Sequence, residues 1–163
     1  MTTEAALRVR LARMEGQHLV TLIDQFLELL RDTGIGEDEA LDRLTPAVYP
    51  DDSEASAEFA EATSADLLDR RAADARVVRT GVQPLLEDPG HGETDLLVPS
   101  GDIDAWLRTL TALRLVIATR LGIAQGDAHD PEDPHFGVYD WLGYRLDLLV
   151  EAADALDEES GAG

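Results

Sequence analysis

The chain has 163 residues, with 34 acidic and 13 basic side chains and a formal net charge of −21 at pH 7. A surface this negative repels the phosphates of nucleic acids and anionic membranes, so we expect neither as a partner. The chain contains no cysteine, lysine or asparagine. This composition excludes a cysteine nucleophile, a disulfide, a Schiff-base lysine and N-glycosylation.

The length suits one domain with its own hydrophobic core, which we place at residues 1–156, followed by a disordered tail at 157–163. No apolar run approaches the ~20 residues of a membrane span. The N-terminal residues lack the apolar core of a signal peptide. We therefore expect a cytoplasmic protein.

The first element is a short strand. Residues 7–11, LRVRL, alternate between apolar side chains and arginine, which is the period of a half-buried strand. The apolar run at about 95–98 is the predicted partner of this strand in a two-stranded ribbon. Arg8, Arg10 and Arg13 make this stretch locally basic. They are either solvated outward side chains or a docking patch for an acidic partner.

The next elements are helices. Residues 15–31 carry a broad apolar stripe at helical spacing, and residues 37–44 form a short helix. A restart after two prolines predicts a helix at 53–62, and a further helix is predicted at 64–87. Gly81 and Pro84, in its last turns, weaken or kink this helix.

The helix predicted at residues 106–123 is apolar on most of its circumference, which is typical of a helix covered from several sides. Ser100 or Asp102 is its expected N-cap, and Gly122 its expected C-terminal residue. A last helix follows Asp133. The fold class is therefore mostly α, a single-domain bundle of about five or six helices with a small ribbon.

Charged side chains interrupt the apolar stripes of four predicted helices. These residues are Glu15, Arg71, Arg114 and Arg145. They form buried ion pairs that fix helix register, or a pocket for an anionic ligand, or they are exposed because the helical phases are misjudged. We predict that Glu15 contacts Arg114 or Arg145.

Residues 129–135 hold two histidines among carboxylates, with His129, Asp130 and His135 as weak metal candidates. The spacing lies in a proline-broken loop, and acids before a helix are explained by capping, so we predict no metal and no cofactor. The chain has no glycine-rich phosphate loop, no GxSxG and no HExxH. These absences favour a protein that is not an enzyme.

Four segments resemble an actinobacterial family catalogued as domain of unknown function twenty-seventeen. They are WLRTLTALRLVIATRLG at 106–122, YPDDSEASAEF at 49–59, DPEDP at 130–134 and VYDWL at 138–142. The resemblance extends over about residues 7–152. None of the four segments is catalytic, so the resemblance implies a family and not a reaction.

The resemblance also implies a cellular context. Genes of the family often lie beside the adaptor that delivers substrates to the Clp protease, or beside a JAMM-type metallopeptidase of sulfur-carrier metabolism. Members are sometimes labelled transcriptional regulators, a role that the negative charge disfavours here. Such context is an association and not a mechanism.

We therefore expect a non-enzymatic protein-interaction or regulatory protein, linked by this context to Clp-adaptor proteostasis or to cysteine and sulfur-carrier metabolism. The alternative is a small-molecule or anion-binding module built on the stripe arginines. A transcriptional regulator and an enzyme are less favoured. The expected partner is another protein, and a homodimer through the exposed parts of the helix at 106–123 stays open.

Overall fold

The computed structural model describes residues 6–32, 38–44, 54–87, 92–122, 132–133 and 136–161, and the side chains of all of these except 54–61 and 160–161. The elements, in chain order, are β1 (Ala6–Ala12), α1 (Arg13–Asp32), α2 (Glu39–Leu44), α3 (Glu54–Glu87), β2 (Glu93–Pro99), a 3₁₀ turn (Ser100–Asp102), α4 (Ile103–Leu121) and α5 (Gly137–Gly161). This order confirms a mostly α fold with a small ribbon. No helix in the described part of the chain is long and apolar enough to cross a bilayer.

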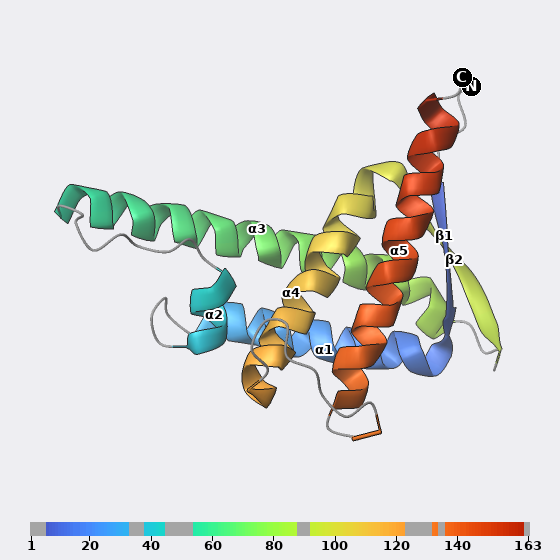
Figure 1. The fold of residues 1–163 in the computed structure, drawn as a ribbon, viewed down its shortest axis with the longest axis horizontal. Helices are drawn as coiled ribbons and strands as arrows, with labels where there is room; N and C mark the ends of the chain where they lie inside the picture. Colours follow the sequence, from blue (N-terminus) through green and yellow to red (C-terminus); the bar gives the residue numbers. More distant parts are fainter. Residues whose placement is uncertain are drawn as a thin grey trace.

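The helices pack in crossed pairs (Figure 1). α1 lies against α3, α4 crosses α3 and contacts α2, and α5 packs on α4 and reaches β1. The N-terminal end of α3 projects beyond the other elements (Figure 1). The two strands lie at the opposite side of the molecule, to the right of α5 in this view.

The ribbon is antiparallel, and its register places Leu7 opposite Val98 and Val9 opposite Leu96. Leu7, Leu96 and Val98 are buried, whereas Arg8, the residue after Leu7 on β1, is exposed. The alternation in the sequence thus becomes one face on the core and one face in solvent. The predicted pairing of these two segments is confirmed.

The core is centred on α4. Trp106, Leu110 and Leu113 on this helix are buried against its neighbours. Gly122 ends the helix with a φ of 74°, and its N–H binds the carbonyls of Ala118 and Thr119, as the predicted C-terminal glycine requires. At the other end, Asp102 occupies the N-cap position without a side-chain hydrogen bond.

α3 is one helix of 34 residues where the sequence predicts two. The predicted break near residue 63 contains neither proline nor glycine, and Ser64 is buried within the helix. Pro84 is tolerated because it is exposed near the C-terminal end. A Cβ at Gly81 would lie 3.1 Å from the Trp106 ring, so this glycine allows α4 to approach.

α5 also differs from the expectation, because it continues to Gly161 through the segment predicted to be a disordered tail. Residues 152–159 hold alanine, leucine, aspartate and glutamate, with no proline or glycine to stop the helix. The tail prediction relied on the position of the segment at the chain end and gave too little weight to helix propensity.

Gly16 is the position where α1 comes closest to α3. A Cβ there would lie 2.6 Å from Leu85 Cδ2 and 3.2 Å from Val82 Cγ1, and both of these side chains are buried. We predict that Gly16→Ala lowers the stability by about 1–2 kcal/mol, because overpacking outweighs the gain in helix propensity. Chemical denaturation measures the change.

The control is Gly137→Ala at the start of α5, where a Cβ would meet nothing within 4 Å. This variant should match or exceed the wild-type stability. Equal denaturation midpoints for the two variants would show that α1 and α3 have room to separate.

Candidate functional site

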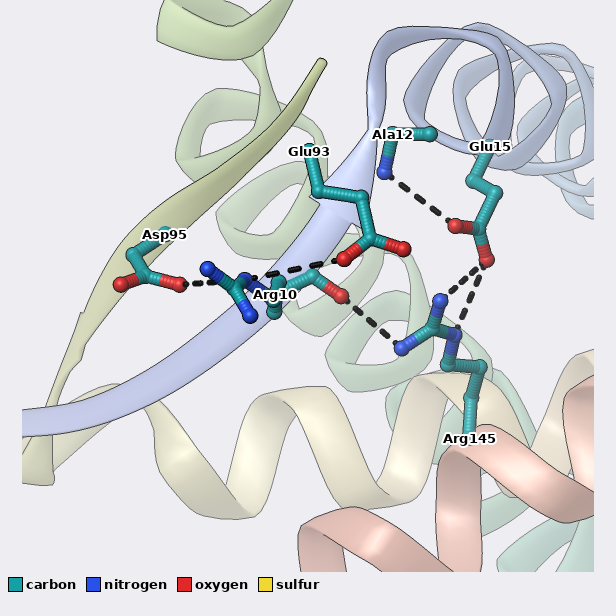
Figure 2. A network of polar contacts seen from close by, with 6 residues as sticks. All are labelled: Arg10, Ala12, Glu15, Glu93, Asp95 and Arg145. Atoms are coloured by element: carbon teal, nitrogen blue, oxygen red, sulfur yellow. Dashed lines mark hydrogen bonds and ion pairs between the residues drawn. The ribbon is translucent and has the colours of Figure 1, made fainter.

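Glu15 and Arg145 form an ion pair where α1 meets α5 (Figure 2). Arg145 Nε donates a 3.0 Å hydrogen bond to Glu15 Oε2, and Arg145 Nη2 donates to the same oxygen. The two side chains are 17% and 23% exposed, for Arg145 and Glu15 respectively, so the pair is largely withdrawn from water. One of the two contacts predicted for Glu15 is therefore present.

The Glu15 carboxylate accepts two further hydrogen bonds. Trp141 Nε1 donates to Oε2 over 2.7 Å, and the Ala12 N–H donates to Oε1 over 3.2 Å. A glutamate that binds the N–H of the residue just before its helix makes the return half of a capping box. Burial raises the pKa of Glu15, but the bonds from Arg145, Trp141 and Ala12 outweigh it and lower the pKa below its ordinary value.

Arg145 also links α5 to the ribbon. Its Nη1 donates a 2.9 Å hydrogen bond to the Arg10 carbonyl, as Figure 2 shows. The Arg10 side chain points away from this bond, with its Nε 3.6 Å from Glu93 and 3.5 Å from Asp95 on β2. The interaction of Glu15 and Arg145 thus connects α1, α5 and β1, and we call it the junction.

Arg114 lies elsewhere, at the crossing of α4 and α5. Its guanidinium carbon is 4.1 Å from the centre of the Tyr139 ring, a cation–π contact. A Cβ at Gly143 would lie 3.1 Å from Arg114 Nε, so the glycine leaves space for the guanidinium. Arg114 Nε is buried without a hydrogen-bond partner in the described part of the chain. An aromatic face has taken the place of the predicted carboxylate.

Arg71 is half-buried on α3, and its Nε likewise finds no hydrogen-bond partner within the described residues. No hydrogen bond or ion pair in the described part of the chain joins it to Glu15, Arg114 or Arg145. The four stripe charges therefore do not form one cluster. Each arginine lies on a different helix, and only Arg145 reaches the glutamate.

A groove runs beside the junction, between β1 and α5, and has a volume of about 440 Å³. Its surface is mainly apolar, with arginines on the β1 side and at the junction. The lining residues are Leu7, Arg8, Val9, Arg10, Leu11, Leu19, Trp106, Leu110, Trp141, Arg145, Leu148, Leu149, Glu151 and Ala152. A cleft of this size and character suits a ligand or a short peptide segment.

The three arginines predicted as a docking patch divide between two environments. Arg8 and Arg10 are exposed and line the groove. Arg13 is half-buried, and its Nε has no hydrogen-bond partner in the part of the chain that the structure describes. Arg13 does not line the groove, because the chain turns from β1 into α1 at this residue.

The weak metal candidates His129, Asp130 and His135 lie outside the described residues. Within the described ranges, no group of three histidine or carboxylate side chains is placed to hold a metal ion.

Sequence reasoning missed several partners in these interactions. The indole N–H of Trp141 is a donor that needs an acceptor when it is half-buried, and this is the signal that could have indicated its bond to Glu15. Asp38 was also missed. It binds the Ala40 N–H at 2.8 Å and Arg120 Nη2 at 2.7 Å, and the Arg120 bond holds the pKa of Asp38 below its ordinary value.

The sequence model of the family described as Domain of unknown function (DUF2017) matches residues 1–153. The chain belongs to this family. No curated protein matches it, and no solved structure does. Since the matched range runs from the ribbon into α5, the junction and the groove both lie within the DUF2017 region.

The junction should contribute measurably to stability. We predict that Arg145→Ala lowers the free energy of unfolding by about 1–3 kcal/mol, less than a fully buried pair because both partners keep some exposure. The matched control is Arg31→Ala, whose side chain is 74% exposed and pairs with the adjacent Asp32. In thermal denaturation, the control should have the melting temperature of the wild type. An equal loss of stability in both variants would mean that the junction contributes nothing specific.

The junction should also be sensitive to acid. Because the folded-state pKa of Glu15 is lowered, its stabilisation is fully present above the ordinary glutamate pKa and is lost as pH falls through the folded value. The stability difference between the wild type and Glu15→Gln should therefore shrink between about pH 6 and pH 3. Denaturation at several pH values measures it, and a constant difference would contradict an ionised Glu15.

Proposed function

We propose that this protein is a non-enzymatic interaction protein with a regulatory role, and that it binds a protein partner in the groove between β1 and α5. The observation that carries the proposal is the character of this groove. It is mainly apolar, yet Arg8, Arg10 and Arg145 line it in a chain whose net charge is −21.

The apolar part of the groove gives a partner surface to bury. Trp106 and Leu149 line the groove and are buried, while Leu148 lines it and remains 39% exposed. An exposed large apolar side chain next to a concave surface is a feature of docking sites, because covering it removes apolar area from water.

The charged part favours an acidic partner segment. Arg8 makes no ion pair within the described part of the chain, and the Arg10 pairs are long and exposed. A positive rim on a strongly negative molecule attracts acidic groups locally while the remaining surface repels them, which gives specificity rather than general adhesion. Acid-rich partners would therefore have to approach in one orientation.

The family context supplies candidate partners. We propose that the partner belongs to Clp-adaptor proteostasis or to cysteine and sulfur-carrier metabolism, in the cytoplasm. An adaptor or a regulator needs a surface for another protein, and a mainly apolar groove bordered by arginines supports such a role.

A second candidate is an anion-binding module. The Nε atoms of Arg71 and Arg114, which are buried and have no hydrogen-bond partner among the described residues, favour it. Against it, Arg145 already has Glu15 as its counter-ion, and neither Arg71 nor Arg114 lines the groove. A rise in melting temperature with inorganic phosphate or citrate that is lost in Arg114→Met would favour this candidate over the first.

Two exposed aliphatic residues on α5, Leu148 and Val150, allow a matched test of the proposal that a protein partner binds in the groove. Leu148 lines the groove and is 39% exposed, while Val150 is 43% exposed and does not line it. We predict that Leu148→Glu abolishes the capture of a specific partner by the tagged protein, whereas Val150→Glu retains it. Affinity purification followed by mass spectrometry compares the two.

The captured complex should also weaken as salt is raised, because screening reduces the attraction of the arginines for an acidic segment. Both variants must first show the wild-type circular dichroism spectrum. If both variants capture the same proteins as the wild type, the groove is not the docking site.

A further inference from the structure

We propose that the groove accepts an extended, acidic and apolar segment of a partner protein, which pairs with the free edge of β1 as a third strand. This inference rests on the proposed function and specifies its mode of binding. Strand addition to an exposed sheet edge combines main-chain hydrogen bonds with pockets for alternate side chains.

The first step is the orientation of the β1 backbone. In an antiparallel pair, a residue turns both its N–H and its C=O either toward the partner strand or away from it, and the two kinds alternate. The Arg10 carbonyl accepts a bond from Arg145 on α5, and so it points away from β2. Ala12, two residues on, donates its N–H to Glu15 and agrees with this assignment.

The second step follows from the alternation. Ala6 and Arg8 share the orientation of Arg10, so their backbone groups also face away from β2. The sheet has only β1 and β2 within the described residues, and outside the ladder of these two strands no backbone hydrogen bond of the described residues reaches the Arg8 N–H or C=O. Arg8 is therefore at the centre of an edge with unused hydrogen-bonding groups.

The third step places the groove along this edge. Residues 7–11 all line the groove, although their side chains alternate between the two faces of the ribbon, as expected where a groove runs beside the strand backbone. Leu148, Leu149 and Ala152 of α5 form the facing wall. The junction closes one end at Arg10, so the free edge from Ala6 to Arg10 spans ~13 Å, room for about five extended residues.

The fourth step concerns the side chains of the added segment. Their alternation would direct one set against the apolar α5 wall and the other set beside Arg8 and Arg10. β2 already shows this pattern on the opposite edge of β1. It directs Leu96 and Val98 into the core and places Glu93 and Asp95 near Arg10.

Charge excludes a second copy of this chain as the occupant. Pairing β1 with the β1 of another molecule would bring arginines of the two strands beside one another, and like charges across strands are destabilising. Two chains of net charge −21 would also repel each other. Glu151 on the α5 wall directs the acidic side chains of the segment to the β1 side. The occupant is therefore an extended segment that alternates acidic and apolar residues.

The test uses the full chain and a blocked nine-residue peptide in which valine and aspartate alternate. Binding is followed by the fluorescence of the tryptophans, because Trp106 and Trp141 both line the groove. We expect saturable binding that Leu148→Glu and Arg8→Glu weaken and Val150→Glu does not. A peptide that alternates valine and arginine should bind more weakly than the aspartate peptide.

Backbone pairing is tested by N-methylating the aspartate peptide at alternate residues, once in each of the two phases. The phase that blocks the N–H groups facing Arg8 should weaken binding by about tenfold or more, because at least two hydrogen bonds are lost. The other phase should bind more tightly than the first.

The outcomes separate the two proposals. Equal binding of both methylated peptides would overturn strand addition while leaving the groove as a docking site. Absence of peptide binding would also overturn strand addition, and selective partner loss in Leu148→Glu would still support the proposed function. A concentration-dependent dimer in light scattering, dissociated by the peptide, would replace the partner segment with a second copy.

Discussion

The ion pair between Glu15 and Arg145 is the constraint on which the arrangement of the ribbon and the last helix depends. One carboxylate ties the start of α1 to α5 through Arg145 and Trp141, and the same guanidinium holds the Arg10 carbonyl of β1. An apolar contact alone would allow α5 to slide along the ribbon. Directional, charge-assisted bonds fix its register, at a desolvation cost that the multiple hydrogen bonds offset.

The stripe arginines show that a buried guanidinium can be accommodated in different ways. Arg145 meets a carboxylate, whereas Arg114 stacks on the Tyr139 ring and occupies the space left by Gly143. The charge of a guanidinium is delocalised and weakly hydrated, so an arginine can be buried against an aromatic ring at a lower desolvation cost than a lysine.

Periodicity was sufficient to predict the ribbon, the core position of α4 and the presence of charges on four apolar stripes. It could not predict partners, because a helical wheel gives the side on which Arg114 lies but not which residue of α5 crosses it. The two errors in helix length, at α3 and α5, concern helix boundaries. The helix continues through residues 62–64 in α3 and through residues 152–159 in α5, where no proline or glycine interrupts it. The groove was beyond prediction, since it depends on the distance between β1 and α5.

That distance has a physical origin in the junction. Arg145 spans the space between α5 and the Arg10 carbonyl, so at this end a polar side chain fills the gap between helix and strand. Toward Ala6 the facing residues are Leu148 and Ala152, which cannot donate hydrogen bonds to the strand edge. A backbone edge left beside apolar side chains is unfavourable unless water or another chain satisfies it. The contact that fixes α5 therefore also leaves this edge without a strand partner among the described residues, and in the proposed binding mode a partner strand would complete it.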